Sequence, residues 1–336
     1  MNFATYIGRR LLFIAPQLLG IVLVSFLLIK TIPGDPAVLM LGPTATPEAI
    51  ASLRAKMGLD QPIFTQFLFY VKALLHGDLG TSWQTTRPVL EDLFQRFPAT
   101  VELVTFGLLT AIAIGVPLGL ASAVHPKGWI ARFADLYGLS AGAVPDFWLA
   151  LVFIYVFYTL LGWLPPPLGR IDLAIIPPAT VTGIYTIDTL IAGDWEAFAS
   201  AASHLILPVA TLGLINAGPI LKMTQATVER MLQSDFSHFE VLSGMPRGMV
   251  IRSALRNSLP SVITIIGVLY GFLIGGAVLV EIVFSWGGAG QYAVQGVLNS
   301  DIYPVMGFVL FSAIFSLIVY LVVDLIYFAI DPRIGH

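Results

Sequence analysis

Six apolar runs, each long enough to cross a lipid bilayer, constrain this chain more than any other feature of its sequence. A membrane-spanning helix needs about 20 predominantly apolar residues. The runs cover residues 11–32, 101–124, 136–163, 205–225, 260–284 and 305–329. Of the 336 residues, 57% are hydrophobic and only 11% are charged, whereas about a quarter of an ordinary soluble domain is charged. The sequence therefore predicts an all-α integral membrane protein with six transmembrane helices.

The positions of Lys and Arg predict which loops face the cytoplasm, because basic residues in short loops remain on the cytoplasmic side of a membrane. Basic residues gather at both chain ends and in alternate loops: Arg9, Arg10, Lys127, Arg132, Lys222, Arg230, Arg247, Arg252, Arg256 and Arg333. The short loop on the opposite side contains only Arg170. We therefore expect both termini to be cytoplasmic. No small-residue cleavage site follows the first run, so it is expected to be an uncleaved signal anchor.

The predicted spans divide the chain into cytoplasmic, membrane and extracytoplasmic parts. The expected parts are cytoplasmic termini at 1–10 and 330–336, a first span at 11–32, an extracytoplasmic segment at 33–98, and a five-helix core at 99–329 that includes an extracytoplasmic loop at 164–204 and a cytoplasmic loop at 226–258. Thr46 and Asp194 are typical helix N-caps, at the starts of TPEAIASLRAKMG and DWEAFASAASH. The amphipathic stretch FTQFLFYVKALLHG is expected to lie on the membrane surface. The loop at 164–204 could be a simple lid, or a surface that meets a soluble partner or the solute.

Composition and motifs exclude several classes of function. The net charge of −3 is not that of a typical nucleic-acid-binding protein, and the absence of cysteine excludes disulfides and thiolate metal sites. No phosphate-binding loop of the form G-x-x-x-x-G-K-[ST] occurs, and the glycines at 287, 288 and 290 are typical of a turn. The five histidines show no metal-binding or catalytic spacing. The chain is therefore expected to be neither an enzyme nor an ATP-binding protein, and to hold no metal.

Four acidic residues fall inside the predicted spans, where an ionisable group is costly and is a functional candidate by default. Glu102, Glu281 and Asp324 lie near span ends, where packing against a neighbouring helix is the favoured explanation. Asp146 lies deeper, and both a solute path and helix packing remain open for it. Asp146, Glu281 and Glu102 are thus the candidates for a solute path.

The cytoplasmic loop between the fourth and fifth runs has features of a structured docking element. Asp235 is expected to cap a short helix, Phe236, Phe239 and Leu242 give that helix an apolar face, and Gly244 ends it before a second helix begins at Pro246. Exposed phenylalanines are unfavourable in water unless a partner covers them. The sequence therefore favours a bound partner protein over the alternative of a loop folded against its own helical bundle.

Sequence motifs along nearly the whole chain resemble the inner-membrane permeases of the dipeptide, oligopeptide and nickel class of ATP-binding cassette importers. The matching segments are PGDPA at 33–37, MGLDQPIFTQF at 57–67, HGDLGTS at 76–82, PATVEL at 98–103, DFWLAL at 146–151, HLILPVATLG at 204–213, RNSLPSVIT at 256–264, GAVLVEIVFSWGGAG at 276–290, DIYPV at 301–305 and VVDLIYFAIDPRI at 322–334. So many segments in the same order make the resemblance specific.

The resemblance implies an assembly and a role for the cytoplasmic loop. It implies a second, related permease, two ATPase subunits that bind ATP and Mg²⁺, an extracytoplasmic solute-binding protein, and a location in the bacterial cytoplasmic membrane among its lipids. The loop would be the coupling helix that contacts an ATPase, and its expected contact residues are Asp235, Phe236, Phe239, Glu240, Leu242, Gly244, Met245, Arg247 and Arg252. The chain departs from the family pattern at residues 239–243, where small and basic residues are usual, and at Gly287, where proline is usual. These departures indicate an ATPase with a matching groove.

The function that the sequence predicts is half of a transmembrane path for small peptides or peptide-like solutes, driven by ATP hydrolysis in partner subunits. Nickel or glutathione are alternative solutes within the same importer class. A secondary transporter driven by protons through Asp146 and Glu281 is a rival, and a membrane-anchor subunit without a transport role is another. The absence of a His or Cys cluster favours peptide over metal.

Overall fold

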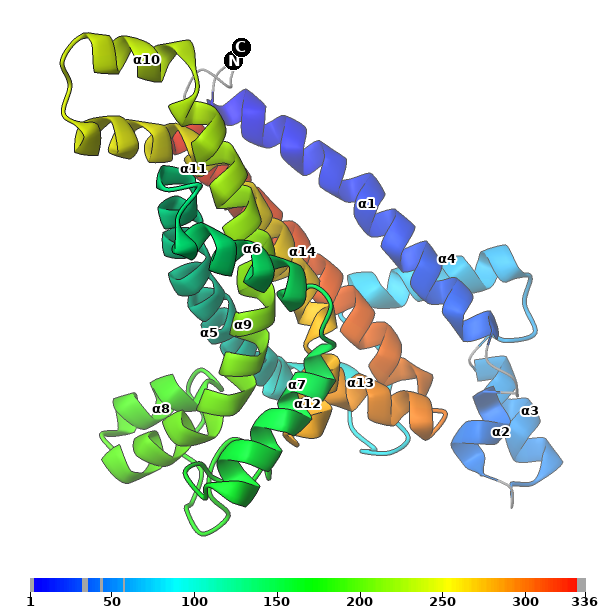
Figure 1. Cartoon of the computed structure of the whole chain (residues 1–336). Coiled ribbons are helices and arrows are strands. Elements are labelled where there is room, and N and C mark those ends of the chain that lie inside the picture. Colours follow the sequence, from blue (N-terminus) through cyan, green and yellow to red (C-terminus); the bar gives the residue numbers. More distant parts are fainter. Residues whose placement is uncertain (1–2, 32–35, 43–44, 57, 331–336) are drawn as a thin grey trace. The chain divides into compact units, whose positions relative to one another are not determined.

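The computed structural model describes residues 3–31, 36–42, 45–56 and 58–330, and the regular structure in these ranges is helical apart from a single bridge between Thr81 and Pro88 (Figure 1). The chain forms two compact units. The first unit comprises Met1–Phe97 and Ala289–Phe315, and the second comprises Pro98–Gly288 and Ser316–His336.

The first unit contains one long apolar helix and several shorter ones. Its helices are α1 (Phe3–Thr31), α2 (Pro36–Leu41), α3 (Pro47–Lys56), α4 (Ile63–Leu75), the start of α5 (Val89–Val124), α13 (Ala289–Leu298) and the start of α14 (Ile302–Ile330). Phe26 of α1 packs edge-on against Phe67 of α4, with ring centroids 5.4 Å apart. The Thr46 hydroxyl accepts a hydrogen bond from the Ala49 N–H at 3.3 Å, which confirms the predicted cap of α3.

A buried carboxylate joins two sequence motifs of the first unit that lie more than two hundred residues apart. Asp301 Oδ2 accepts hydrogen bonds from the Ser82 hydroxyl at 2.6 Å and from the Trp83 N–H at 2.7 Å. Nearby, the Tyr292 hydroxyl donates to Asp92 Oδ2 at 2.9 Å. Burial and the neighbouring Asp92 carboxylate raise the pKa of Tyr292 to about 12. The segments HGDLGTS and DIYPV therefore belong to one packed structure.

The second unit is built around α9, against which most of its other helices pack. Its helices are the rest of α5, α6 (Trp129–Ala141), α7 (Asp146–Phe153), the π-helix η1 (Ile154–Leu160), α8 (Tyr185–Ala192), α9 (Trp195–Leu232), α10 (Asp235–Leu242), α11 (Arg247–Gly276), α12 (Val278–Val283) and the rest of α14. Helices α6, α7, α8, α10, α11 and α12 all contact α9. Asp194 Oδ1 accepts the Ala197 N–H at 2.9 Å, which confirms the predicted cap, but the helix that it starts continues as α9 rather than ending near residue 204.

Four helices are long and apolar enough to cross a membrane: α5, α9, α11 and the Ile302–Ile326 part of α14. A fifth span is possible if α6 and the α7–η1 pair, which are bent by 107° at their junction, count as one broken helix. Within α1, the described apolar stretch Leu12–Leu27 is shorter than these. The chain is therefore a multi-pass membrane protein in which four or five spans are evident by length and composition.

Two predicted spans were wrong as continuous helices. The run at 136–163 is interrupted between α6 and α7, where Pro145 has extended backbone angles and provides no N–H for a continuing helix. The run at 260–284 is divided because α11 ends at Gly276 and the short helix α12 follows. In addition, α5 begins at Val89, so the predicted boundary at residue 98 falls inside a helix.

Candidate functional site

Helix α10 and the first turns of α11 form an arm that extends from the ends of the long helices of their unit (Figure 1). Ser234 is the N-cap of α10, with extended backbone angles and a hydroxyl that accepts the Ser237 N–H at 3.4 Å. The prediction that Asp235 is the cap was therefore wrong by one residue, because Asp235 already has helical geometry. Its carboxylate still stabilises the helix, because it lies in the first turn, near the positive end of the helix dipole.

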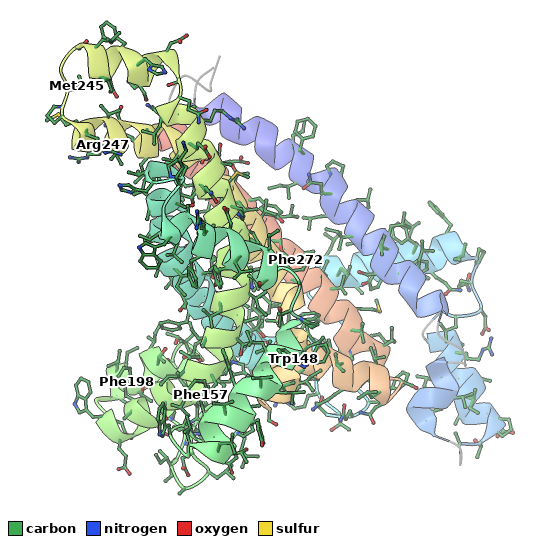
Figure 2. All side chains as sticks on the ribbon, in the orientation of Figure 1. Trp148, Phe157, Phe198, Met245, Arg247 and Phe272 are labelled. Carbon is green, nitrogen blue, oxygen red and sulfur yellow. The ribbon has the colours of Figure 1, made fainter. Side chains whose placement is uncertain are left out.

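The surface of this arm is apolar where a soluble loop would be polar. Leu242 is 88% exposed and Phe239 is 68% exposed. The other large apolar side chains exposed on the arm are Phe236, Val241, Met245 and Met249. Figure 2 shows Met245 and Arg247 at the turn between the two helices. Contiguous exposed apolar side chains of this kind are typical of an interaction site.

The inner face of α10 is polar and the turn that follows it depends on a glycine. Ser237 and Glu240 are the buried residues of the helix. Gly244 has a φ of +78°, which favours glycine, and its N–H donates to the Val241 carbonyl. No heavy atom lies within 4 Å of the place where a β-carbon of Gly244 would be. The left-handed conformation, rather than a crowded environment, therefore explains glycine here.

The base of the arm is fixed to the helical core of its unit. The Arg247 Nη2 group donates to the Val124 carbonyl at the end of α5, at 3.5 Å. Ala123, Val228 and Ala254 form a buried apolar cluster between the ends of α5, α9 and α11. Arg252, the last of the predicted coupling residues, is exposed. A force on the arm would therefore reach three long helices.

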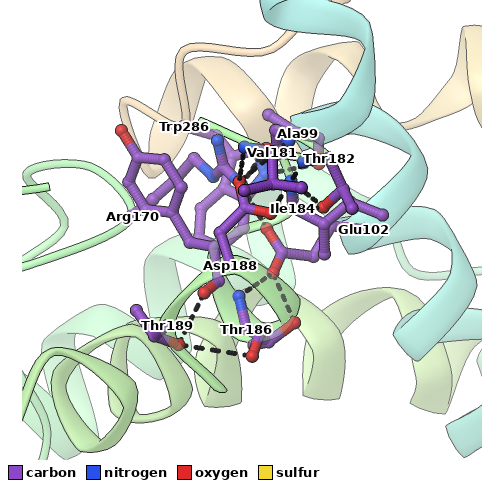
Figure 3. A network of polar contacts seen from close by, with 12 residues as sticks. Ala99, Glu102, Arg170, Val181, Thr182, Ile184, Thr186, Asp188, Thr189 and Trp286 are labelled. Atoms are coloured by element: carbon purple, nitrogen blue, oxygen red, sulfur yellow. Dashed lines mark hydrogen bonds and ion pairs between the residues drawn. The ribbon is translucent and has the colours of Figure 1, made fainter. Parts of the chain in front are cut away.

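A second polar cluster joins the loop before α8 to α5 (Figure 3). Arg170 Nη2 lies 2.5 Å from Glu102 Oε2; the Glu102 side chain is buried and only 10% of the Arg170 side chain is exposed. The same Glu102 accepts hydrogen bonds through Oε1 from the Thr186 N–H at 2.9 Å and its hydroxyl at 2.7 Å. The Arg170 guanidinium also lies over the Tyr185 ring, 3.7 Å from its centroid. This cluster fixes the loop to the core.

Asp188 organises the turn that precedes α8. Its carboxylate accepts hydrogen bonds from the Thr182 N–H and hydroxyl and from the Gly183 N–H, at 2.7–2.9 Å. Burial disfavours the ionised carboxyl, but these hydrogen bonds outweigh it and hold the pKa of Asp188 below its usual value of 3.8. The turn is therefore predicted to be stabilised by an ionised carboxylate.

The depressed pKa of Asp188 predicts how this turn responds to acid. A group whose pKa is lowered by folding contributes its full stabilisation above its unfolded-state value of 3.8, and loses it as the pH falls through the folded-state value. Cleavage of residues 178–190 by pepsin should therefore remain slow near pH 4 and accelerate only at lower pH. In Asp188→Asn, cleavage should already be faster near pH 4 and should lack this transition, and the two proteins should become similar at the lowest pH. Equal cleavage of the two proteins near pH 4 would contradict the prediction.

Glu281 of α12 is fully buried, and its carboxylate holds the turn that follows this helix. Its Oε1 atom accepts the Thr100 hydroxyl of α5 at 2.5 Å. A β-carbon on Gly288 would lie only 2.3 Å from the same oxygen, so the carboxylate occupies the space that glycine leaves open. The Trp286 indole N–H of this turn donates to the Ala99 carbonyl at 2.9 Å (Figure 3). The turn is thus attached to α5 at two points.

Asp146 has a different environment from the other two solute-path candidates. It is the first residue of α7, directly after the break at Pro145, and it is half-buried. Its carboxylate makes no hydrogen bond or ion pair within the described ranges. Glu102 lies in the network of Figure 3 and Glu281 accepts a hydrogen bond from Thr100, whereas Asp146 takes part in neither interaction, although its helix α7 contacts α12.

Several residues of this network were not identified as site residues from the sequence. Arg170, Thr186 and Asp188 lie in a loop for which no local pattern predicts their partners. One signal was present, because Arg170 is the only Lys or Arg between Arg132 and Lys222. A single basic residue in a loop whose other charged residues are acidic indicates a specific ion pair. Within the part of the chain that the structure describes, no group of three His, Asp or Glu residues could hold a metal ion.

Comparison with known proteins gives matches along the whole chain. The family described as "Binding-protein-dependent transport system inner membrane component" matches residues 115–336. Residues 3–104 match the corresponding N-terminal family, described as "Binding-prot-dependent transport system membrane comp, N-term". Together the two matches include α10, Asp146 and the network around Arg170.

Three curated relatives illustrate the range of named solutes. The chain is 40% identical to the probable D,D-dipeptide transport system permease protein DdpB of Escherichia coli, over 100% of the chain and 99% of the relative. It is 41% identical to the dipeptide transport system permease protein DppB of Alkalihalophilus pseudofirmus, over 98% and 99%. It is 33% identical to the glutathione transport system permease protein GsiC of Salmonella typhimurium, also over 98% and 99%.

Proposed function

The chain belongs to the family of binding-protein-dependent transport system inner membrane components, and we propose that it forms half of the path by which an ATP-driven importer takes up di- or oligopeptides. Two of the relatives above are named for dipeptides and one for glutathione, which is itself a peptide. These names support a peptide or peptide-like solute. Nickel, the remaining solute of the resemblance, has no support from a cluster of metal ligands among the described side chains.

The proposed membrane topology has six spans with both termini in the cytoplasm. Support comes from the four long apolar helices, from the broken α6–α7 pair, and from the apolar part of α1. The positions of Lys and Arg support the orientation. In this topology the arm is cytoplasmic, whereas the Arg170 network is extracytoplasmic. The segments 33–98 and 164–204 would then face the solute-binding protein.

The exposed apolar face of α10 is the observation that best supports coupling to an ATPase. In the proposed assembly, this chain pairs with a second, related permease and two ATPase subunits, and a solute-binding protein delivers the solute. ATP and Mg²⁺ would be bound by the ATPase subunits alone, so the chain itself would not be catalytic. Phe236, Phe239, Leu242 and Met245 would enter a groove of the ATPase, and Arg252 would lie beside it.

Coupling requires that the arm moves together with the membrane helices. The Arg247–Val124 hydrogen bond and the apolar cluster at Ala254 join the arm to α5, α9 and α11. Closure of the ATPases would then tilt these helices between outward-open and inward-open states. A rigid connection is needed because a flexible arm would absorb the movement.

We assign different roles to the three acids that are candidates for the solute path. Glu102 and Glu281 are proposed to fasten the outer ends of helices, since each is buried and already accepts hydrogen bonds within the protein. Asp146 is proposed for the solute path, since it lies at the break of a span and has no internal partner in the described residues. A carboxylate there could receive the amino terminus of a peptide.

Loss of the apolar face of the arm should prevent assembly with the ATPases. In Leu242→Asp, a charge replaces an exposed apolar side chain at the centre of the proposed interface, and we expect the ATPase subunits to be lost from the affinity-purified complex. Leu242→Met keeps the apolar character and should behave as the wild type. Partners would be identified after purification in mild detergent, and ATP hydrolysis measured with and without the solute-binding protein. An intact complex with stimulated hydrolysis in Leu242→Asp would refute the proposed coupling role.

The same preparation distinguishes the proton-driven rival. Purification of the chain without ATPase subunits, combined with uptake that an uncoupler abolishes and that persists in cells lacking the ATPases, would favour a secondary transporter. Uptake that depends on the ATPase genes would favour the importer.

A further inference from the structure

Glu240 differs from every other buried acid among the described residues because its carboxylate has no partner. Only 6% of the residue is exposed, and its Oε2 atom is fully shielded from solvent without a hydrogen bond. Hydrogen bonds are accepted by each of the other five buried acids: Asp92, Glu102, Asp188, Glu281 and Asp301. A buried carboxylate without a partner is costly, so its presence requires an explanation.

The bases nearest in the sequence do not neutralise Glu240 within the chain. Arg247 donates to the Val124 carbonyl instead. Arg252 is exposed and forms no ion pair with Glu240 in the described structure. The backbone carbonyl of Glu240 is used, since it accepts the Met245 N–H at 3.1 Å, but its side chain is not. A cation that pairs with Glu240 would therefore have to come from outside the chain.

The surroundings of Glu240 define the chemistry of that partner. Phe236 lies one helical turn before Glu240, on the same face of α10, and is half exposed. Beyond them, the turn at Gly244 leaves an open space where a side chain would be. A half-exposed aromatic ring beside a carboxylate suits a cation on a long aliphatic stem, because the stem covers the ring while the charge reaches the acid.

We propose that Glu240 receives the side chain of an Arg or Lys from the partner ATPase, and that this pair selects which ATPase docks on the arm. This inference rests on the proposed coupling role of the arm. A charged pair enclosed by apolar side chains excludes water and is typical of an interface hot spot. An ATPase lacking the base would leave Glu240 buried and unpaired, so the acid would also act against wrong partners.

The test compares two acids of the same helix. The chain, together with its second permease, is placed in lipid nanodiscs, and the affinity for the purified ATPase is measured for Glu240→Gln and Asp235→Asn. Both variants remove one negative charge, but Asp235 is exposed whereas Glu240 is buried. We expect Glu240→Gln to weaken binding by about tenfold or more. Asp235→Asn should change it by less than about threefold.

Two further measurements separate the possible outcomes. Single replacements of each exposed Arg and Lys of the ATPase, combined with Glu240→Gln, should reveal one base whose effect disappears in the double variant. Unchanged affinity in Glu240→Gln would overturn the proposed pair. If Leu242→Asp still abolished binding in that case, the coupling role would stand without it. If neither variant affected binding, both the pair and the proposed coupling role would fail.

Discussion

Replacing Arg170 with methionine is expected to destabilise the second unit by about 3–5 kcal/mol, because one partner of a buried ion pair would remain without the other. The guanidinium lies 2.5 Å from Glu102 Oε2, and only 10% of the Arg170 side chain and 2% of the Glu102 side chain are exposed. Methionine keeps much of the apolar volume but leaves the Glu102 carboxylate uncompensated. The effect would be measured as a fall in the midpoint of thermal unfolding in detergent.

A double variant separates the charge from the packing at this site. In Glu102→Gln combined with Arg170→Met, neither position of the pair carries a charge, and part of the lost stability should return. Arg54→Met provides a matched control, because the Arg54–Asp60 pair at 3.2 Å is exposed and should contribute no more than about 1 kcal/mol. If Arg170→Met were as mild as Arg54→Met, the network could not be what fixes the loop to α5.

The amino-acid pattern was sufficient to predict the helices but not their breaks. Each predicted span falls on a helix or a pair of helices, because a long apolar run has few other stable conformations in lipid. Pro145 indicated a possible kink in one run, but not the sharp bend that separates Ala141 from Asp146. Hydropathy reports where a segment is buried and contains no information about the direction of its backbone. The shorter helices α8 and α12 were missed for a related reason, since they are too short to show a period.

The arm and the network around Arg170 differ in how far they could be predicted from the sequence. The apolar residues of the arm could be recognised because Phe236, Phe239 and Leu242 are close together in the sequence. Their exposure follows from the structure, as does the burial of Glu240 in the same helix. Glu102 and Arg170 are 68 residues apart, so only the tertiary fold makes them partners.

The structure also gives physical reasons for two motifs that the sequence could only match to a family. Asp301 of DIYPV accepts hydrogen bonds from the hydroxyl of Ser82, the last residue of HGDLGTS, and from the N–H of Trp83, which follows it. These bonds explain why the two motifs occur together. Gly288 lies directly against the Glu281 carboxylate, which explains a glycine after the Trp286 turn. Gly287 has a φ of +73°, which glycine adopts readily and which proline, with φ fixed at about −65°, cannot adopt, so the turn in this chain is incompatible with the usual proline.

Replacing Gly244 with valine is expected to uncouple ATP hydrolysis from solute uptake. A residue with a side chain pays about 1–2 kcal/mol to adopt left-handed angles such as the φ of +78° at Gly244, and a β-branched residue resists them most strongly. The turn should therefore open, and α10 should change its direction relative to α11. We expect the amount of solute imported per ATP hydrolysed to fall by about tenfold. A penalty of about 1.4 kcal/mol on the conformation of the turn that transmits the movement would produce a change of this size.

Gly244→Asn is the matched control, because asparagine tolerates left-handed angles better than other residues with side chains and the space around Gly244 is open. If backbone conformation determines coupling, the asparagine variant should retain most of the uptake that the valine variant loses. Uptake into proteoliposomes and hydrolysis stimulated by the solute-binding protein would be measured together for both variants. Equal losses in the two variants would show that the ATPase contacts the glycine surface itself. Normal uptake and normal stimulated hydrolysis in Gly244→Val would mean that the arm does not transmit the movement of the ATPase.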